Sequence, residues 1–197
     1  MLRTARLFIT ICCLKDPHHK RHAERVQAVA LEIAKVLELS EKDQHLLEHA
    51  ALLHDIGKAF VSEKILGKEG ELTEQEWSLI KLHPSLAYEF LKHFAPEVAE
   101  AILHHHENWD GSGYPDGLKG EEIPLLARII RIADSIDAGC SKRTYKEAKP
   151  FAVVCEEIQH GAGSFYDPEI VSVLGNGKKK SFQNSILHSF SRPFLFR

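Results

Sequence analysis

The stretch that decides the fold reads L-L-E-H-A-A-L-L-H-D-I-G-K and spans residues 46–58. Its apolar residues recur at the spacing of an amphipathic helix. His54 follows Ala50 by four residues, so its imidazole points into the core from the apolar face. Asp55 comes next, and a buried carboxylate is costly unless it is paired or bound to a metal. With Lys58 close behind, the stretch predicts His, Asp and Lys clustered at the buried end of one helix.

The same helical spacing runs through most of the chain. Apolar residues between 26 and 37 repeat every three or four positions, with charged residues between them. Ser40 is predicted to cap the next helix, which is expected to end at Gly57, and Thr73 with Glu76 predicts a capping box. Period-two alternation is absent, so we expect no sheet. The sequence predicts an all-α fold, a globular multi-helix bundle.

Proline and glycine set the predicted boundaries of the later helices. The helix that begins after Thr73 is expected to stop at His83-Pro84, because the residue before a proline avoids the helical region. Residues 109–120 hold four glycines and a proline, which predicts a loop. Pro124 is predicted to stand in the first turn of a strongly apolar helix. Helices are expected at about 85–94, 96–107, 124–138, 150–161 and 168–174.

Composition bounds the class of protein. The chain has 197 residues, of which 44% are hydrophobic and 27% are charged, as in folded globular proteins. The formal net charge is only −3, which gives no signature of nucleic-acid binding. No apolar run reaches the roughly 20 residues of a membrane span. We divide the chain into an N-terminal helix (residues 1–15), a main domain (16–174) and a basic, apolar C-terminal tail (175–197).

The cysteines and the N-terminal residues indicate in which cellular compartment the protein is expected. None of Cys12, Cys13, Cys140 and Cys155 makes a C-x-x-C pair, which argues against a zinc knuckle or a disulfide scaffold. Reduced thiols are typical of a cytoplasmic protein, and this is the location that we expect. The short apolar run 7–14 is interpreted as part of the first helix rather than a secretion signal, because no cleavage site follows.

Histidines are the most unusual feature, since the chain holds 13 of them. His105 and His106 are neighbours, and neighbouring helical residues point about 100° apart, so the two can straddle a cluster of ions. His83 stands at a helix end, and Asp134 lies on the apolar face of its helix. Taken singly, each inward His or Asp is more often a satisfied core residue. Their number is what indicates a site.

Together these residues predict metal binding, because so many inward polar groups would otherwise stay unpaired. His and carboxylate donors suit Fe, Mn, Zn, Co or Ni rather than Mg or Ca, and iron or manganese is our first expectation. The candidates exceed the needs of one ion, so we expect two divalent ions that share Asp55. Two metals about 3.5–4 Å apart are typical of phosphoester hydrolysis. The candidate ligands are His22, His54, Asp55, His83, His105, His106 and Asp134.

Several stretches read together as an ordered set. They are D-P-H-H-K-R-H-A-E-R-V (16–26), H-D-I-G-K (54–58), H-P (83–84), H-H-E-N-W-D-G-S-G-Y-P (105–115), I-A-D-S-I-D-A-G-C-S-K-R-T-Y-K (132–146) and F-Y-D-P (165–168). H-D alone is a weak signal, whereas the ordered set is very specific. Over about residues 16–174 the chain resembles the HD-GYP family of the HD superfamily of metal-dependent phosphohydrolases.

The resemblance implies an all-helical domain with a buried metal site that hydrolyses cyclic di-GMP, a bacterial second messenger, to the linear dinucleotide or GMP. It implies that a metal-bridging hydroxide attacks phosphorus. His18 stands where some members place a glutamate that helps to bind a third metal, so it is the candidate for that role. One of the two expected ions would be held by His22, His54, Asp55 and Asp134, and the other by Asp55, His83, His105 and His106.

The resemblance also implies substrate contacts. Asp55 and Lys58 would be catalytic, with Lys58 holding a phosphate oxygen and stabilising the developing charge. Arg143 and Lys146 match positions that grip the phosphates of the ligand. Tyr114, in the Gly-Tyr-Pro loop, would shape the guanine end of the pocket and present a surface to partner signalling proteins.

Other functions stay open. Gly139, Cys140 and Thr144 depart from the usual family pattern, so another cyclic or mononucleotide is an alternative substrate. A catalytically silent binding or signalling module is a second alternative, against which the complete ligand set argues. Nucleic-acid binding has only the lysines at 178–180 in its favour, and we expect none. The apolar residues at 182, 186, 190 and 194 would suit an amphipathic helix on a membrane or a partner, but a frayed or docked tail is our preferred interpretation.

Overall fold

The computed structural model describes residues 17–141, 148–175 and Ile186. Within these ranges the regular structure is helical, with one isolated β-bridge between Ala162 and Tyr166. The prediction of an all-α fold is therefore confirmed. The predicted helix over residues 1–15 and nearly all of the predicted tail (175–197) lie outside the described residues.

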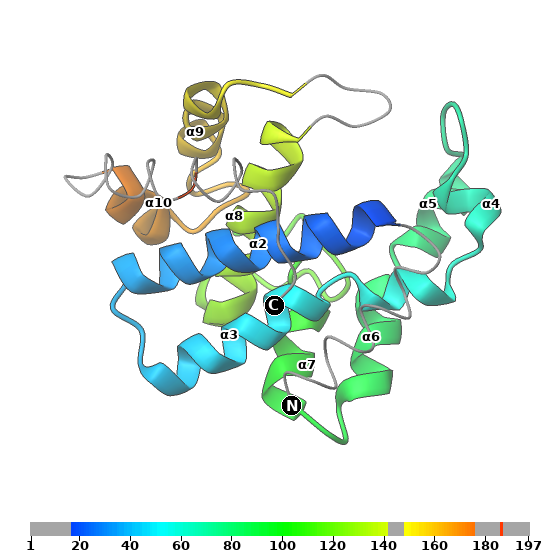
Figure 1. The fold of residues 1–197 in the computed structure, drawn as a ribbon, viewed down its shortest axis with the longest axis horizontal. Coiled ribbons are helices and arrows are strands. Elements are labelled where there is room, and N and C mark those ends of the chain that lie inside the picture. The colour runs from blue at the N-terminus through cyan, green and yellow to red at the C-terminus, as the bar shows by residue number, and fades with distance from the viewer. Residues whose placement is uncertain (1–16, 142–147, 176–185, 187–197) are drawn as a thin grey trace.

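Three helices form the centre of the molecule. α2 (Pro17–Val36) packs against both α3 (Glu41–Leu53) and α8 (Leu125–Cys140), and Figure 1 shows it lying across them. α3 also packs against α7 (Pro96–Leu103), which pairs with α6 (His83–Leu91). The remaining helices are α4 (Glu63–Leu66), α5 (Glu74–Ile80), α9 (Phe151–His160) and α10 (Pro168–Gly175), and the 3-10 helices are η1 (Ile56–Phe60) and η2 (Gly120–Glu122).

Two predicted caps are confirmed. The hydroxyl of Ser40 accepts a hydrogen bond from the backbone N–H of Asp43 at 3.1 Å and so begins α3. At the start of α5, the Glu76 N–H donates to the Thr73 hydroxyl at 3.2 Å, while the Thr73 N–H donates to the Glu76 carboxylate at 2.7 Å. Both caps satisfy backbone donors that have no partner within the first helical turn.

Three predicted helix ends are wrong, and they share a physical cause. α3, α5 and α7 end at Leu53, Ile80 and Leu103, before the predicted positions 57, 83 and 107. In each case a histidine beyond the end places its ring nitrogen against a carbonyl of the last turn, which otherwise lacks a partner. The pairs are His54 with Ala51, His83 with Ile80, and His105 with Ile102.

The two prolines also act differently from the prediction. Pro84 lies in the first turn of α6, where its missing N–H costs no hydrogen bond, so it begins a helix rather than ending one. The residues between α5 and α6 keep helical dihedral angles. Pro124 is the N-cap of α8 rather than a first-turn residue, and α8 runs past position 138 to Cys140. The four-residue helix α4 had no counterpart among the predicted helices.

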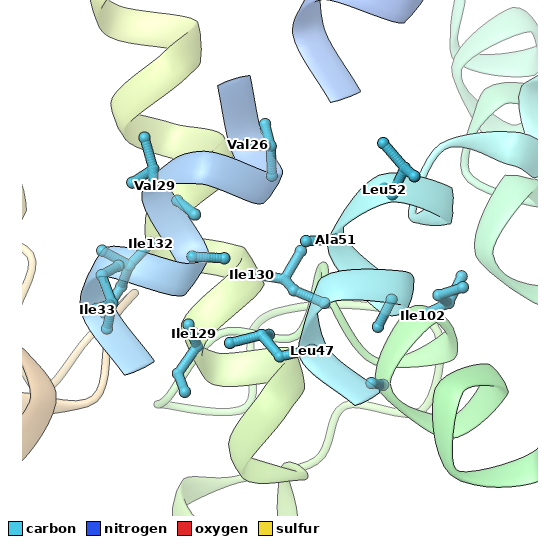
Figure 2. Packing of buried hydrophobic residues seen from close by; sticks show 14 of the residues in the cluster. Val26, Val29, Ile33, Leu47, Ala51, Leu52, Ile102, Ile129, Ile130 and Ile132 are labelled. Atoms are coloured by element: carbon cyan, nitrogen blue, oxygen red, sulfur yellow. The ribbon is translucent and has the colours of Figure 1, made fainter. Parts of the chain in front are cut away.

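An aliphatic core joins the central helices. Figure 2 shows side chains from α2, α3 and α8 meeting there, with Ile102 of α7 beside them. Each fully buried Leu or Ile contributes about 1.5–3 kcal/mol relative to an exposed one. Ile186 is fully buried in the same cluster, so at this residue the tail is docked. The labelled residues are Val26, Val29, Ile33, Leu47, Ala51, Leu52, Ile102, Ile129, Ile130 and Ile132.

In the part of the chain that the structure describes, no helix combines the length and the apolar character needed to cross a bilayer. Cys140 and Cys155 are thiols rather than half-cystines. The cytoplasmic location and the division of the chain at residues 15 and 174 stay predictions.

Replacing Leu47 by alanine should lower the free energy of unfolding by about 2–5 kcal/mol, because the truncation leaves a cavity between α2, α3 and α8. Urea denaturation followed by circular dichroism measures the loss. Leu79→Ala is the matched control, since Leu79 is 48% exposed and should cost much less. Equal losses for the two variants would contradict this description of the core.

Candidate metal centre

The carboxylate of Asp55 faces histidines on both of its oxygens. Asp55 is the residue before η1 and is only 9% exposed. Oδ2 lies 3.5 Å from His22 Nε2 and 3.6 Å from His54 Nε2, whereas Oδ1 lies 3.2 Å from His83 Nε2. A carboxylate with donor atoms on either side has the geometry of a bridge between two ions.

The first group of potential ligands comes from α2, the end of α3 and α8. One donor atom each from His22, His54 and Asp55 lies within 4.8 Å of the others. The Nε2 atoms of His22 and His54 are 3.1 Å apart. Asp134 of α8 stands beside this group, with Oδ1 3.4 Å from His22 Nε2.

The second group comes from the start of α6 and the segment after α7. Asp55, His83, His105 and His106 each place a donor atom within 4.8 Å of the others. The Nε2 atoms of His83 and His105 are 3.4 Å apart, and the rings of His105 and His106 have centroids 4.0 Å apart. Thus the structure gathers six of the seven predicted ligands into two groups that share Asp55, and it places Asp134 beside the first group.

Backbone carbonyls fix the ring orientation of three of these histidines. His54, His83 and His105 place Nδ1 within 2.6–2.8 Å of a carbonyl oxygen, which can only accept a hydrogen bond. Nδ1 must therefore carry the proton, and Nε2 presents a lone pair toward Asp55. Metal-binding histidines use this arrangement, in which the second nitrogen sets the tautomer of the first.

Within the described ranges, no protein donor lies at the centre of the second group. His83 Nε2, His105 Nε2 and Asp55 Oδ1 all face one another as acceptors, and Oδ1 is buried without a hydrogen-bond partner among the described residues. Facing lone pairs repel in a site that excludes water. A cation removes the conflict, so the donor set fits a divalent metal.

Burial and charge shift the pKa values of this cluster in opposite directions. Burial lowers the pKa of His54, and it lowers the pKa of His106 to about 3. Burial opposes protonation of His22, but hydrogen bonds to Asp137 and Asp55 outweigh it and raise the pKa to about 9. Burial also raises the pKa of Asp55, yet the nearby charge of Lys58 holds it well below its usual range. A protonated His22 carries the positive charge of the first group, and binding of a metal to this histidine would release the proton.

Two residues that support the cluster were not among the predicted ligands. Asp137 accepts a hydrogen bond from His22 Nδ1 at 2.8 Å and pairs with Arg25, whose Nη2 donates to Oδ2 at 3.1 Å. Arg25 follows His22 by three residues on α2, and Asp137 follows Asp134 by three on α8. This i, i+3 spacing was the available sequence signal.

The predicted substrate contacts are placed in part. Lys58 Nζ donates to Asp55 Oδ2 at 2.7 Å. The Tyr114 ring stacks on His106 with centroids 4.9 Å apart, and its backbone N–H donates to the His106 carbonyl at 3.2 Å. Burial and the nearby Asp55 raise the pKa of the Tyr114 hydroxyl. Arg143 and Lys146 lie outside the described residues, as does the side chain of His18.

A family model for the HD domain matches residues 6–170. The chain belongs to the HD domain family. The adjacent His54 and Asp55 at the centre of the cluster are the H-D pair singled out in the sequence. Membership of this family agrees with the helical fold and with the buried cluster of His and Asp residues.

Named relatives extend the comparison. RpfG, the cyclic di-GMP phosphodiesterase response regulator of Xanthomonas campestris pv. campestris, is 43% identical over 159 residues, which are 79% of this chain and 42% of that protein. A cyclic di-GMP phosphodiesterase of Thermotoga maritima is 41% identical over 164 residues, 81% of this chain and 45% of that protein. The 3'3'-cGAMP-specific phosphodiesterase 3 of Vibrio cholerae is 39% identical over 162 residues, 81% of this chain and 35% of that protein. The chain spans less than half the length of these relatives.

Solved structures show the same fold. An HDG"Y"P protein from Bdellovibrio bacteriovorus matches with a TM-score of 0.65 at 23% identity, over 80% of this chain and 51% of that one. The HD domain of the phosphodiesterase PgpH from L. monocytogenes, in complex with cyclic-di-AMP, matches with a TM-score of 0.64 at 16% identity, over 96% and 99% of the two chains. They share the fold, while the family match and the named relatives confirm the resemblance to the HD-GYP family.

Replacing Gly57 by alanine should disrupt the cluster. A Cβ at this position would lie 1.9 Å from the carbonyl oxygen of His83, so η1 and the start of α6 must separate. We expect the free energy of unfolding to fall by more than about 2 kcal/mol, measured by urea denaturation. Gly67→Ala is the control, because its nearest added contact is 3.2 Å and its φ of −95° suits any residue. Similar stability of both variants would contradict the close packing of Gly57 on His83.

Proposed function

We propose that this chain is a metal-dependent phosphodiesterase that hydrolyses cyclic di-GMP to the linear dinucleotide or GMP. The observation that carries the proposal is the placement of Asp55, whose two oxygens face two separate groups of histidines. Two adjacent divalent ions, when bound there, would activate water and neutralise the oxygens of a phosphodiester. The names of the relatives supply the substrate class.

The ligand assignment follows the two groups. We assign His22, His54, Asp55 and Asp134 to one ion, and Asp55, His83, His105 and His106 to the other. The donors are nitrogen and carboxylate oxygen, which suit iron or manganese, with zinc, cobalt and nickel as alternatives. His18 stays the candidate for a third ion. Asp137 would hold His22 in the tautomer that keeps Nε2 available, as carboxylates do behind other metal-bound histidines.

Lys58 and Tyr114 would act on the substrate side. The Lys58 ammonium contacts the bridging carboxylate, so it lies near any phosphate held between the ions and would stabilise negative charge as it develops. The Tyr114 ring stacks on His106, which places an aromatic face beside the second group. We propose that the Tyr114 ring forms one side of the pocket that binds a base of the substrate. Arg143 and Lys146 are proposed to hold the phosphates.

The test is turnover by purified protein loaded anaerobically with Fe²⁺ or Mn²⁺. Cyclic di-GMP should yield linear dinucleotide or GMP, measured by liquid chromatography, and Asp55→Asn should abolish the reaction. Because one relative is named for 3'3'-cGAMP, that nucleotide is assayed beside cyclic di-GMP. If 3'3'-cGAMP is cleaved faster, it replaces cyclic di-GMP as the proposed substrate. Protein that binds metal but cleaves no cyclic dinucleotide would instead be a silent binding module.

Lys58→Ala should lower kcat for the cyclic dinucleotide by about 10²–10³-fold, as expected for the loss of a group that stabilises charge in the transition state. Lys64→Ala is the control, since Lys64 is exposed on α4, and it should leave kcat unchanged. Metal content is measured for both variants, because Lys58 contacts Asp55. An unchanged kcat in Lys58→Ala with full metal content would remove Lys58 from the mechanism.

A further inference from the structure

A second cluster of potential ligands lies where α7 ends and the Gly-Tyr-Pro loop begins. His104, Glu107 and Asp116 each place a donor atom within 4.8 Å of the others, and none of these residues belongs to the Asp55 cluster. His104 and Glu107 are 6% and 2% exposed, whereas Asp116 lies at the surface. This cluster has no role in the proposed reaction.

The imidazole of His104 stands between acidic groups. Nε2 is 3.4 Å from a carboxylate oxygen of Glu100, one turn earlier on α7. Nδ1 is 3.8 Å from Glu107 Oε1 and 3.7 Å from Asp116 Oδ2, and it is buried with no hydrogen-bond partner within the described part of the chain. If Nε2 carries the proton toward Glu100, Nδ1 points a lone pair at two carboxylates.

Glu107 is the second buried residue with a polar atom that lacks a hydrogen-bond partner among the described residues. Its Oε1 accepts hydrogen bonds from the backbone N–H groups of Asp116 and Gly117, at 2.8 and 3.1 Å. Its Oε2 is buried and has no partner among the described residues. A buried carboxylate oxygen without a partner is energetically unfavourable, because it has lost its hydrogen bonds to water.

We propose that His104, Glu107 and Asp116 bind a structural divalent cation of the Zn²⁺ type, separate from the catalytic centre. One imidazole nitrogen and two carboxylates form a mixed donor set that suits such an ion. Glu100 behind Nε2 supplies the carboxylate that commonly orients a metal-bound histidine. The site also lies at the C-terminal end of α7, where the helix dipole favours positive charge.

The distances suit ligands around one ion better than direct hydrogen bonds between these residues. An N–H donor on His104 would be drawn to within about 3.2 Å of an oxygen, yet Nδ1 stays 3.7 and 3.8 Å from the two carboxylates. Ligand atoms about 2.1 Å from a tetrahedral Zn²⁺ lie roughly 3.4 Å apart. The observed separations are close to that spacing, so a small contraction around an ion completes the site.

The cation would bind both ends of the loop segment from Glu107 to Asp116. Glu107 opens the segment and Asp116 follows Tyr114-Pro115, so an ion shared by the two carboxylates and α7 fixes the chain on either side of Tyr114. The Gly113 backbone already packs so closely that an added Cβ would lie 2.3 Å from the Asn108 nitrogen. The site would hold the Tyr114 ring in its position on His106.

The test counts zinc in the full chain after dialysis against Zn²⁺, by mass spectrometry of the metal, and locates it by anomalous diffraction of Zn²⁺-grown crystals. Asp116→Ala and His104→Gln should each bind one equivalent less than the unaltered protein. Glu121→Ala, which removes an exposed acid a few residues beyond Asp116, should bind the same amount. The anomalous map should show a peak between His104, Glu107 and Asp116.

Two results would overturn the site. One is an equal zinc count in Asp116→Ala, His104→Gln and Glu121→Ala. The other is an anomalous map with peaks at the Asp55 cluster and none beside His104. Activity is not a readout here, so this result and the outcome for the proposed phosphodiesterase stay distinguishable.

Discussion

Asp55 must be neutralised from both sides, and the arrangement of the central helices follows from that constraint. Its two oxygens face histidines from different segments, so the ends of α2, α3 and α6 and the segment after α7 have to meet at one carboxylate. A charged group at 9% exposure is tolerated only when a positive charge is close, which Lys58 supplies beside Oδ2 and a bound cation would supply beside Oδ1. The aliphatic contacts of α2, α3, α7 and α8 hold those ends in place (Figure 2).

Three of the histidines are placed in the site by the same local arrangement. His54, His83 and His105 each follow the last turn of a helix and bond a carbonyl three residues back. One bond thereby satisfies a helix end, fixes the tautomer, and aims the other nitrogen at Asp55. Three helix C-termini also converge on the centre, and their partial negative charge favours a cation there.

The sequence predicted the helical fold and every residue of the two groups, because inward position follows from helical spacing. The helix ends predicted at 57 and 83 from a glycine and a proline, and the end predicted at 107, were misplaced, since these sequence signals cannot tell a buried histidine inside a helix from one that caps it. Asp137 and Arg25 were missed as partners of His22, because their contact joins α2 to α8 and depends on how those helices cross. Tertiary packing decides such contacts, and one sequence does not record it.

Substrate choice within this fold has to come from outside the metal groups. In the proposed site, two ions and Lys58 would recognise a phosphodiester, which cyclic di-GMP and 3'3'-cGAMP share, whereas guanine and adenine differ in the groups that their edges offer for hydrogen bonding. Relatives named for the two nucleotides are 43% and 39% identical to this chain, so overall similarity does not separate the two substrates. Stacking is tolerant of the base, because every base has a π-face. The Tyr114 ring would therefore hold a base in place, and the groups that hydrogen-bond to its edge would select it.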